Sequence, residues 1–171
     1  MQKKIIVSFM LFCLISLMII AGAEAKNQEE NWDIKQQTIE FMAPDFTLSD
    51  LDGNTVSLNS LRGKVVLVLF TTTWCPYCIK DIPNLKKTYE QYCDKDFELL
   101  AVYIQESQRK VSSFAAKYNL PYTVLLDTKG AVARSYGVVG VPTKVLIGKD
   151  GKVYCRACRT LDIMLKELIG P

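Results

Sequence analysis

The chain has 171 residues, of which 49% are hydrophobic and 23% are charged, enough for one domain with a packed core. Its formal net charge of +3 is typical of a mixed, solvated surface and argues against nucleic acid or another polyanion as a partner. The sequence contains no histidine, which excludes every mechanism that needs an imidazole as base or ligand.

Residues 1–25 are predicted to be an export signal. Lys3 and Lys4 precede an uncharged apolar run from Ile5 to Ile20, and Ala23-Glu24-Ala25 supplies the small residues that a signal peptidase reads. An uncleaved membrane anchor over residues 5–23 is the alternative, because this run nearly reaches the ~20 apolar residues that span a bilayer. Either reading places the rest of the chain in the periplasm or on the extracytoplasmic side of the membrane.

Residues 26–40 are polar and predict a linker, so the folded domain is expected over residues 41–171. Within that domain, Asp52-Gly53-Asn54 separates two short apolar–polar segments and predicts a leading β-hairpin. The run KVVLVLF over residues 64–70 follows, and its length and β-branched content predict a strand buried on both faces.

The rest of the chain alternates between helical and strand patterns. Helices are predicted over 76–93, with a kink at Pro83, over 107–118, capped by Ser107, and over 131–136 and 161–169. Strands are predicted over 97–104 and 122–126, and a second hairpin joins 143–147 to 152–156. This order predicts an α/β fold with a mixed central sheet and helices on both faces.

Cys75-Pro76-Tyr77-Cys78 stands where the buried strand passes into the first helix. The free N–H groups and the dipole at a helix start stabilise an anion, so a thiolate on Cys75 is favoured there. We expect Cys75, as the more exposed sulfur, to attack a substrate disulfide and Cys78 to resolve the mixed disulfide. A static disulfide that caps the helix is the alternative. No cofactor and no metal are expected at this pair.

These residues resemble the thioredoxin superfamily and, within it, the TlpA/ResA-type thiol–disulfide oxidoreductases of the cell envelope. The resemblance also rests on residues 41–48 (FMAPDFTL), residues 61–67 (LRGKVVL), Trp74 before the cysteine pair, Pro83, and residues 140–143 (GVPT). It implies a three-layer thioredoxin-like fold with a cis peptide bond at Pro142. It also implies that Val141 presents its backbone to substrate, and Trp74, Pro76 and Tyr77 complete the expected substrate-binding surface.

Glu106 follows the second buried strand, at the position where ResA-like proteins carry a glutamate beside the cysteines. A carboxylate there is expected to move a proton to or from Cys78. The alternative is a solvated charge at a helix start. The chain departs from many relatives by its Thr71-Thr72-Thr73 run and by the dipeptide Pro76-Tyr77, which leaves the direction of electron flow open.

A second pair, Cys155 and Cys158, is spaced like the first. Three readings stay open: inert or structural thiols, a second redox pair close to the first, or a metal site. Residues i and i+3 on a strand point to opposite faces, so a bridge between them needs a turn or a bulge. Cys93, about 22 Å along the helix from Cys78, is expected to be a packed core thiol.

The residues and the resemblance together predict an oxidoreductase that acts on disulfides of envelope proteins, with reduction favoured and cytochrome c maturation as one candidate process. A membrane thiol donor is the second expected partner. One alternative is a cysteine-based metallochaperone. The other is a peroxidase, for which the expected Pro-x-x-x-Thr-x-x-Cys motif is incomplete because Val68 occupies the proline position.

Overall fold

The computed structural model describes residues 41–158 and 160–170. The predicted export signal, the alternative anchor and the linker fall within residues 1–40, outside that part of the chain. None of the helices in the described part is both long and apolar enough to cross a membrane.

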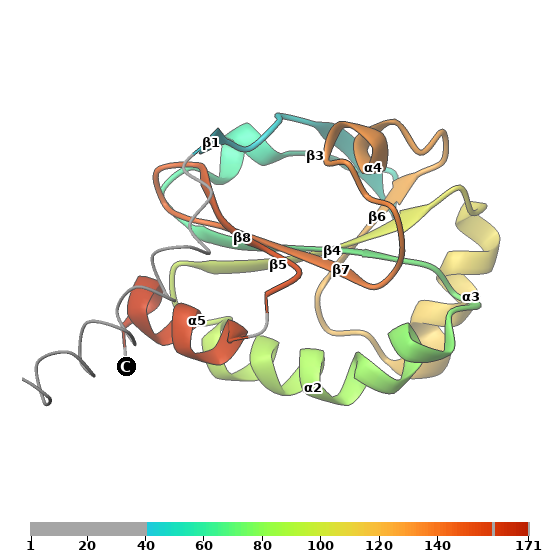
Figure 1. Cartoon of the computed structure of the whole chain (residues 1–171). Helices are drawn as coiled ribbons and strands as arrows, with labels where there is room; N and C mark the ends of the chain where they lie inside the picture. The colour runs from blue at the N-terminus through green and yellow to red at the C-terminus, as the bar shows by residue number, and fades with distance from the viewer. Residues whose placement is uncertain (1–40, 159, 171) are drawn as a thin grey trace, which may run out of the picture. The chain divides into compact units, whose positions relative to one another are not determined.

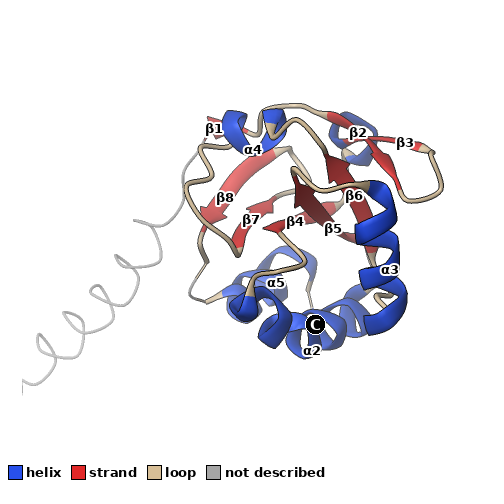
Figure 2. Cartoon of the chain, turned by 90° about the vertical axis from the view of Figure 1, so that its right-hand side faces the viewer, coloured by secondary structure: helices blue, strands red, loops and turns tan. Residues whose placement is uncertain are grey.

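An eight-stranded sheet forms the centre of the domain, with the strand order β1-β8-β7-β4-β5-β6-β2-β3 (Figures 1 and 2). The strands β4, β5 and β6 are parallel, and the remaining pairs are antiparallel, so the sheet is mixed as predicted. Their bounds are β1 (Phe41–Met42), β2 (Thr47–Asp50), β3 (Thr55–Ser57), β4 (Val65–Thr71), β5 (Phe97–Ile104), β6 (Thr123–Asp127), β7 (Thr143–Ile147) and β8 (Lys152–Arg156).

Helices lie on both faces of the sheet, which confirms the three-layer prediction. Figure 1 shows α2 and α5 below the sheet, α3 at its right-hand end and α4 above it, and α3 shares one core cluster with α2 and α5. Their bounds are α2 (Pro76–Tyr92), α3 (Gln108–Tyr118), α4 (Ala131–Ser135) and α5 (Leu161–Ile169), and a single 3-10 turn, η1, spans Leu58–Leu61. The leading hairpin, β2 and β3, forms one edge of the sheet through the pairing of β2 with β6.

Both faces of β4 pack in the hydrophobic core, as its sequence predicts. All seven of its residues are buried. Val65, Leu67 and Leu69 pack against the layer of α2, α3 and α5. The alternate residues Val68 and Phe70 join a second core cluster with α4 on the opposite face. Full burial of each such side chain contributes roughly 1.5–3 kcal/mol to the stability of the fold. Packing on both faces therefore fixes β4, and with it the position at which the strand ends.

Ser107 precedes α3 with an extended backbone, φ −75° and ψ 146°, but its side chain makes no capping hydrogen bond. The predicted side-chain cap is therefore wrong, although the position of the helix start is right. Pro83 lies inside α2, where it removes one helical donor, and the kink expected there stays a prediction.

Candidate active site

The sulfur of Cys75 caps the first turn of α2. Cys75 is the N-cap residue, with φ −79° and ψ 115°, and its Sγ accepts a hydrogen bond from the backbone N–H of Cys78 at 3.2 Å. The sulfur thus takes the place that a serine or aspartate oxygen takes in an ordinary cap. Pro76 occupies the first helical turn, where its missing N–H costs nothing. The helix N–H groups would stabilise an anion on this sulfur, and the carbonyl oxygen of Val141, 3.6 Å from it, would oppose that effect.

Both cysteines of the pair are free thiols, and both are buried. Cys75 is 4% exposed and Cys78 is 5% exposed, so the expectation that Cys75 is the more exposed residue is wrong. The reason lies in the loop before β7: the thiol of Cys75 donates to the carbonyl oxygen of Val141 at 3.6 Å. The peptide bond between Val141 and Pro142 is cis, the isomer that the resemblance implied.

Cys78 is held in its protonated form. Burial, followed by its hydrogen bond with Cys75, raises the pKa of the Cys78 thiol to about 11. A side-chain hydrogen bond from Thr71 and a backbone hydrogen bond from Thr72 oppose that shift but do not cancel it. At neutral pH Cys78 therefore keeps its proton.

The threonine run before the site is entirely buried. Thr71 interacts with the thiol of Cys78. Thr73 donates its backbone N–H to Glu106 at 2.7 Å and its hydroxyl to the same carboxylate at 2.6 Å. The hydroxyl oxygen of Thr72 has no hydrogen-bond partner among the described residues. Thr71, the last residue of β4, thus contacts the thiol of Cys78, and Thr73, in the loop that follows, contacts Glu106.

Glu106 is buried against Thr73, two residues before Cys75. The ammonium group of Lys110 lies 2.6 Å from its Oε1. Burial alone would raise the pKa of Glu106, but the hydrogen bonds from Lys110 and Thr73 hold it below the ordinary value. No hydrogen bond within the described residues joins Glu106 to Cys78. The geometry is that of a residue that positions the loop, and the expected proton transfer stays a prediction.

The residue before Glu106 has a left-handed backbone conformation, which turns Glu106 toward the loop that precedes Cys75. Gln105 has φ 55°, and its backbone N–H donates to the carbonyl of Asp127 at 2.9 Å. A non-glycine residue with positive φ costs energy and is common at functional sites. No pattern in the sequence marks Gln105.

Three exposed apolar side chains lie on the segments that carry the cysteine pair and the cis proline. Trp74, directly before the pair in sequence, and Tyr77, between its two cysteines, are both exposed. Val139 is fully exposed, three residues before Pro142. No sequence pattern marks Val139, because a single valine in a loop carries no signal until its exposure is known.

The second cysteine pair forms a disulfide, with 5.6 Å between the Cα atoms of Cys155 and Cys158. The steric objection to a bridge is met by a turn: β8 ends at Arg156, and Ala157 follows with φ 53°. Within the described residues, no three or more cysteine, aspartate or glutamate side chains converge as metal ligands would.

Cys93 does not belong to the core. It is exposed at the end of α2, where its thiol donates weakly to the carbonyl of Glu90 at 3.8 Å. The prediction of a packed thiol is therefore wrong. α2 buries its sheet-facing side, including Leu85 and Tyr92, and Cys93 comes after the last helical residue.

Comparisons with known proteins show which family this chain resembles in sequence and fold. The AhpC/TSA family model matches residues 39–156. The thiol-disulfide oxidoreductase ResA of Bacillus thuringiensis subsp. konkukian is 35% identical over 146 residues, which cover 84% of each chain. The thioredoxin domain of a thiol-disulfide oxidoreductase from Bacteroides vulgatus superposes with a TM-score of 0.69 at 30% identity, covering 75% of this chain and 96% of its own. A putative thiol:disulfide interchange protein DsbE from Chlorobium tepidum gives 0.67 at 33% identity, with 75% and 92% covered.

Proposed function

We propose, for a chain that belongs to the AhpC/TSA family and is a thiol–disulfide oxidoreductase of the ResA type, that Cys75 and Cys78 are the exchanging cysteines and that the protein reduces disulfides. The observation that carries this assignment is the hydrogen bond from the N–H of Cys78 to the sulfur of Cys75 at the start of α2. It gives one sulfur of the pair the environment of an attacking thiolate.

The proposed exchange has two steps. The thiolate of Cys75 attacks one sulfur of the substrate disulfide, forms a mixed disulfide and releases the other substrate sulfur as a thiolate. Cys78 then loses its proton and attacks the sulfur of Cys75, which frees the second substrate thiolate. The two substrate sulfurs gain two electrons, and the protein is left with a disulfide between Cys75 and Cys78.

The high pKa of Cys78 bears on the second step. A resolving thiol that keeps its proton does not compete for the helix N–H groups in the resting state. Formation of the mixed disulfide removes the thiol of Cys75, whose hydrogen bond is the second cause of the raised pKa, so resolution becomes easier once substrate is attached.

Substrate is proposed to lie along the loop of the cis proline. The carbonyl of Val141 already contacts the thiol of Cys75, so a bound segment there can pair its backbone with Val141 while its sulfur meets Cys75. Trp74 and Tyr77, which are exposed beside and within the pair in sequence, offer apolar contact. The peptide bond that follows Val141 in this loop is the cis bond to Pro142.

The substrates are proposed to be envelope proteins that carry disulfides, with cytochrome c maturation as one process that such a reductase serves. A membrane thiol donor would restore the thiols of Cys75 and Cys78. The apolar run and the Ala23-Glu24-Ala25 site in the sequence support export to the periplasm or the extracytoplasmic face of the membrane.

The reduction of insulin by dithiothreitol tests the assignment of the pair. The protein is expected to accelerate the reaction, Cys75→Ser to abolish the acceleration, and the matched control Cys93→Ser to retain it. A reduction potential of the pair nearer about −270 mV supports a reductase, and one near about −120 mV would reverse the direction. Consumption of hydrogen peroxide faster than of disulfide would favour the peroxidase alternative instead.

A further inference from the structure

The disulfide between Cys155 and Cys158 joins a buried sulfur to an accessible one. Cys155 is 1% exposed and belongs to the core cluster that β8 shares with α2 and α5. It pairs with Leu146 of the neighbouring strand β7. Cys158 is only partly buried and lines a groove between α2 and α5. An incoming thiolate can therefore reach the sulfur of Cys158 but not that of Cys155. This asymmetry fixes which sulfur is attacked and which one leaves.

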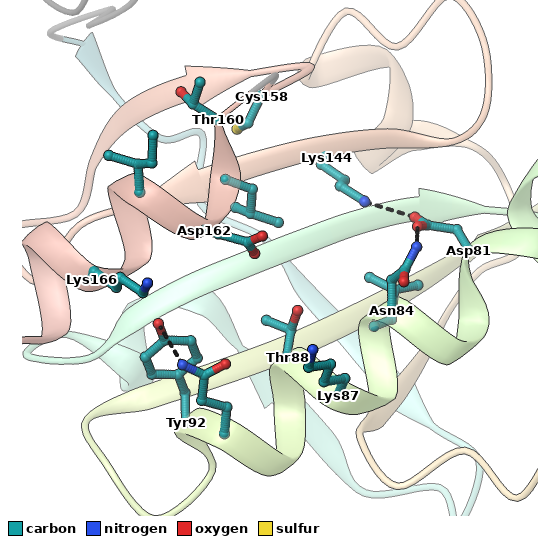
Figure 3. Close-up of a pocket in the computed structure, with 14 residues that line it drawn as sticks. Asp81, Asn84, Lys87, Thr88, Tyr92, Lys144, Cys158, Thr160, Asp162 and Lys166 are labelled. Carbon is teal, nitrogen blue, oxygen red and sulfur yellow. Dashed lines mark hydrogen bonds and ion pairs between the residues drawn. The ribbon is translucent and has the colours of Figure 1, made fainter. Parts of the chain in front are cut away.

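The groove gives a thiolate a path to Cys158. Its volume is about 680 Å³, and Figure 3 shows Cys158 beside Thr160 at one end of it. Three lysines and two aspartates supply the charged groups of its lining: Lys87, Lys144, Lys166, Asp81 and Asp162. Asp81 is already paired with Lys144 at 2.7 Å. The lining thus carries one more positive than negative charge, which favours an anionic thiolate over a neutral thiol.

The disulfide between Cys155 and Cys158 is poorly suited to stabilise the fold. It encloses only two residues, and the stabilisation that a cross-link gives by restricting the unfolded chain grows with the length of the loop it closes. It also accompanies a left-handed backbone at Ala157, whose N–H donates to the carbonyl of Lys144 at 2.8 Å. A non-glycine residue is normally unfavourable in that conformation. A function in exchange accounts for such a bridge better than a function in stability.

We propose that Cys155 and Cys158 form a second thiol–disulfide exchange centre, which a thiolate reductant opens through the groove between α2 and α5. The reductant is either a small thiol or the cysteine of a redox protein. Its thiolate attacks the sulfur of Cys158, so that a mixed disulfide forms and Cys155 leaves as a thiolate that takes a proton. A second thiolate attacks the reductant's sulfur in that mixed disulfide and releases Cys158. One disulfide has then been reduced by two electrons, and the reductant has been oxidised to its own disulfide.

A full-length variant with Cys13→Ser, Cys75→Ser, Cys78→Ser and Cys93→Ser keeps only the second pair. Because it lacks the proposed catalytic cysteines, its result does not depend on the function proposed above. The folded variant is equilibrated in glutathione buffers of graded redox ratio while circular dichroism monitors the fold. Exchange is then quenched with acid, and the thiols are alkylated in denaturant, so that the buried Cys155 is also labelled, before the protein is weighed. The proposal predicts a reversible gain of two alkyl groups with the fold unchanged. A disulfide that glutathione reduces only when denaturant is present during the equilibration would overturn it.

The route through the groove has its own test in the same background. Lys87→Glu reverses an exposed charge of the groove, and Lys117→Glu is the matched control on α3. We expect Lys87→Glu to slow reduction by glutathione several-fold and Lys117→Glu to leave the rate within twofold. Equal rates for both variants would contradict the proposed path. Reduced thioredoxin replaces glutathione in a parallel arm: faster reduction by thioredoxin at equal thiol concentration identifies a protein as the source, and slower reduction identifies a small thiol.

Discussion

Thr73 and Glu106 are joined twice: the backbone N–H and the hydroxyl of Thr73 both donate to the carboxylate of Glu106, at 2.7 and 2.6 Å. This double contact ties the loop that precedes Cys75 to the end of β5. We therefore expect the carboxylate of Glu106 to act on the cysteines through the backbone of the loop between β4 and α2.

Replacement of Glu106 tests this positioning role. Glu106→Ala leaves two buried donors of Thr73 without an acceptor, which costs about 1–3 kcal/mol of unfolding free energy and slows disulfide exchange. Glu106→Gln keeps one acceptor oxygen and is expected to recover most of the exchange rate. Chemical denaturation and insulin reduction measure the two effects. If Glu106→Gln were as slow as Glu106→Ala and its pH–rate profile lost a limb, Glu106 would be a proton-transfer group instead.

Lys110 should stabilise the fold in a pH-dependent way. Because the pKa of Glu106 is lowered in the folded protein, its contribution is present above the ordinary carboxyl pKa of about 4.3 and is lost as the pH falls through the lowered value. Lys110→Met is expected to cost roughly 1 kcal/mol at pH 7, since Lys110 is half exposed, and nothing in acid. Urea titrations of this variant and of the control Lys117→Met provide the comparison. An equal loss at both pH values would rule out the ion pair as the cause.

Cys78 should resist alkylation at neutral pH. Its raised pKa, about 11, leaves almost no thiolate at pH 7–9, and the side chain is buried, whereas Cys93 is exposed. Peptide mapping after iodoacetamide treatment is expected to show Cys93 labelled at least tenfold faster than Cys78. The same shift implies that stability declines as the pH rises from about 9 to about 11, because the unfolded thiol ionises first. Comparable labelling of the two residues would contradict this environment.

Val139 should contribute to substrate affinity and not to stability. Its side chain is fully exposed, so Val139→Ser removes no buried contact. We expect KM for a protein disulfide to rise a few-fold, with kcat and the melting temperature unchanged. The exposed position Ala116 on α3 provides the control, Ala116→Ser. A fall in kcat without a change in KM would place Val139 outside the substrate surface.

The sequence predicts the structure correctly where a strong local pattern and the tertiary packing agree. The run over residues 64–70 forms a strand buried on both faces, and Cys75 stands at the start of the next helix, because each requires only local spacing. The features that it could not predict depend on distant contacts. The burial of Cys75 depends on Val141, which lies 66 residues away, and the partners of Glu106 depend on how β4 and β5 pair.

The disulfide between Cys155 and Cys158 shows the limit of periodicity arguments. A regular strand forbids this bridge, and the bridge exists because Ala157 leaves the strand conformation, which alanine gives no reason to expect. Cys93 shows the same limit at a helix end. A shift of one residue in the end of the helix determines whether its side chain is buried in the core or exposed to solvent.

Trapping of the mixed disulfide tests the central claim most directly. Cys78→Ser, incubated with a disulfide-bearing protein substrate, is expected to accumulate a covalent complex, and peptide mapping should place the bond at Cys75. The doubly substituted protein, Cys75→Ser with Cys78→Ser, should form none. A complex bonded through any other cysteine, or one that persists without Cys75, would contradict the assignment of Cys75 as the attacking sulfur.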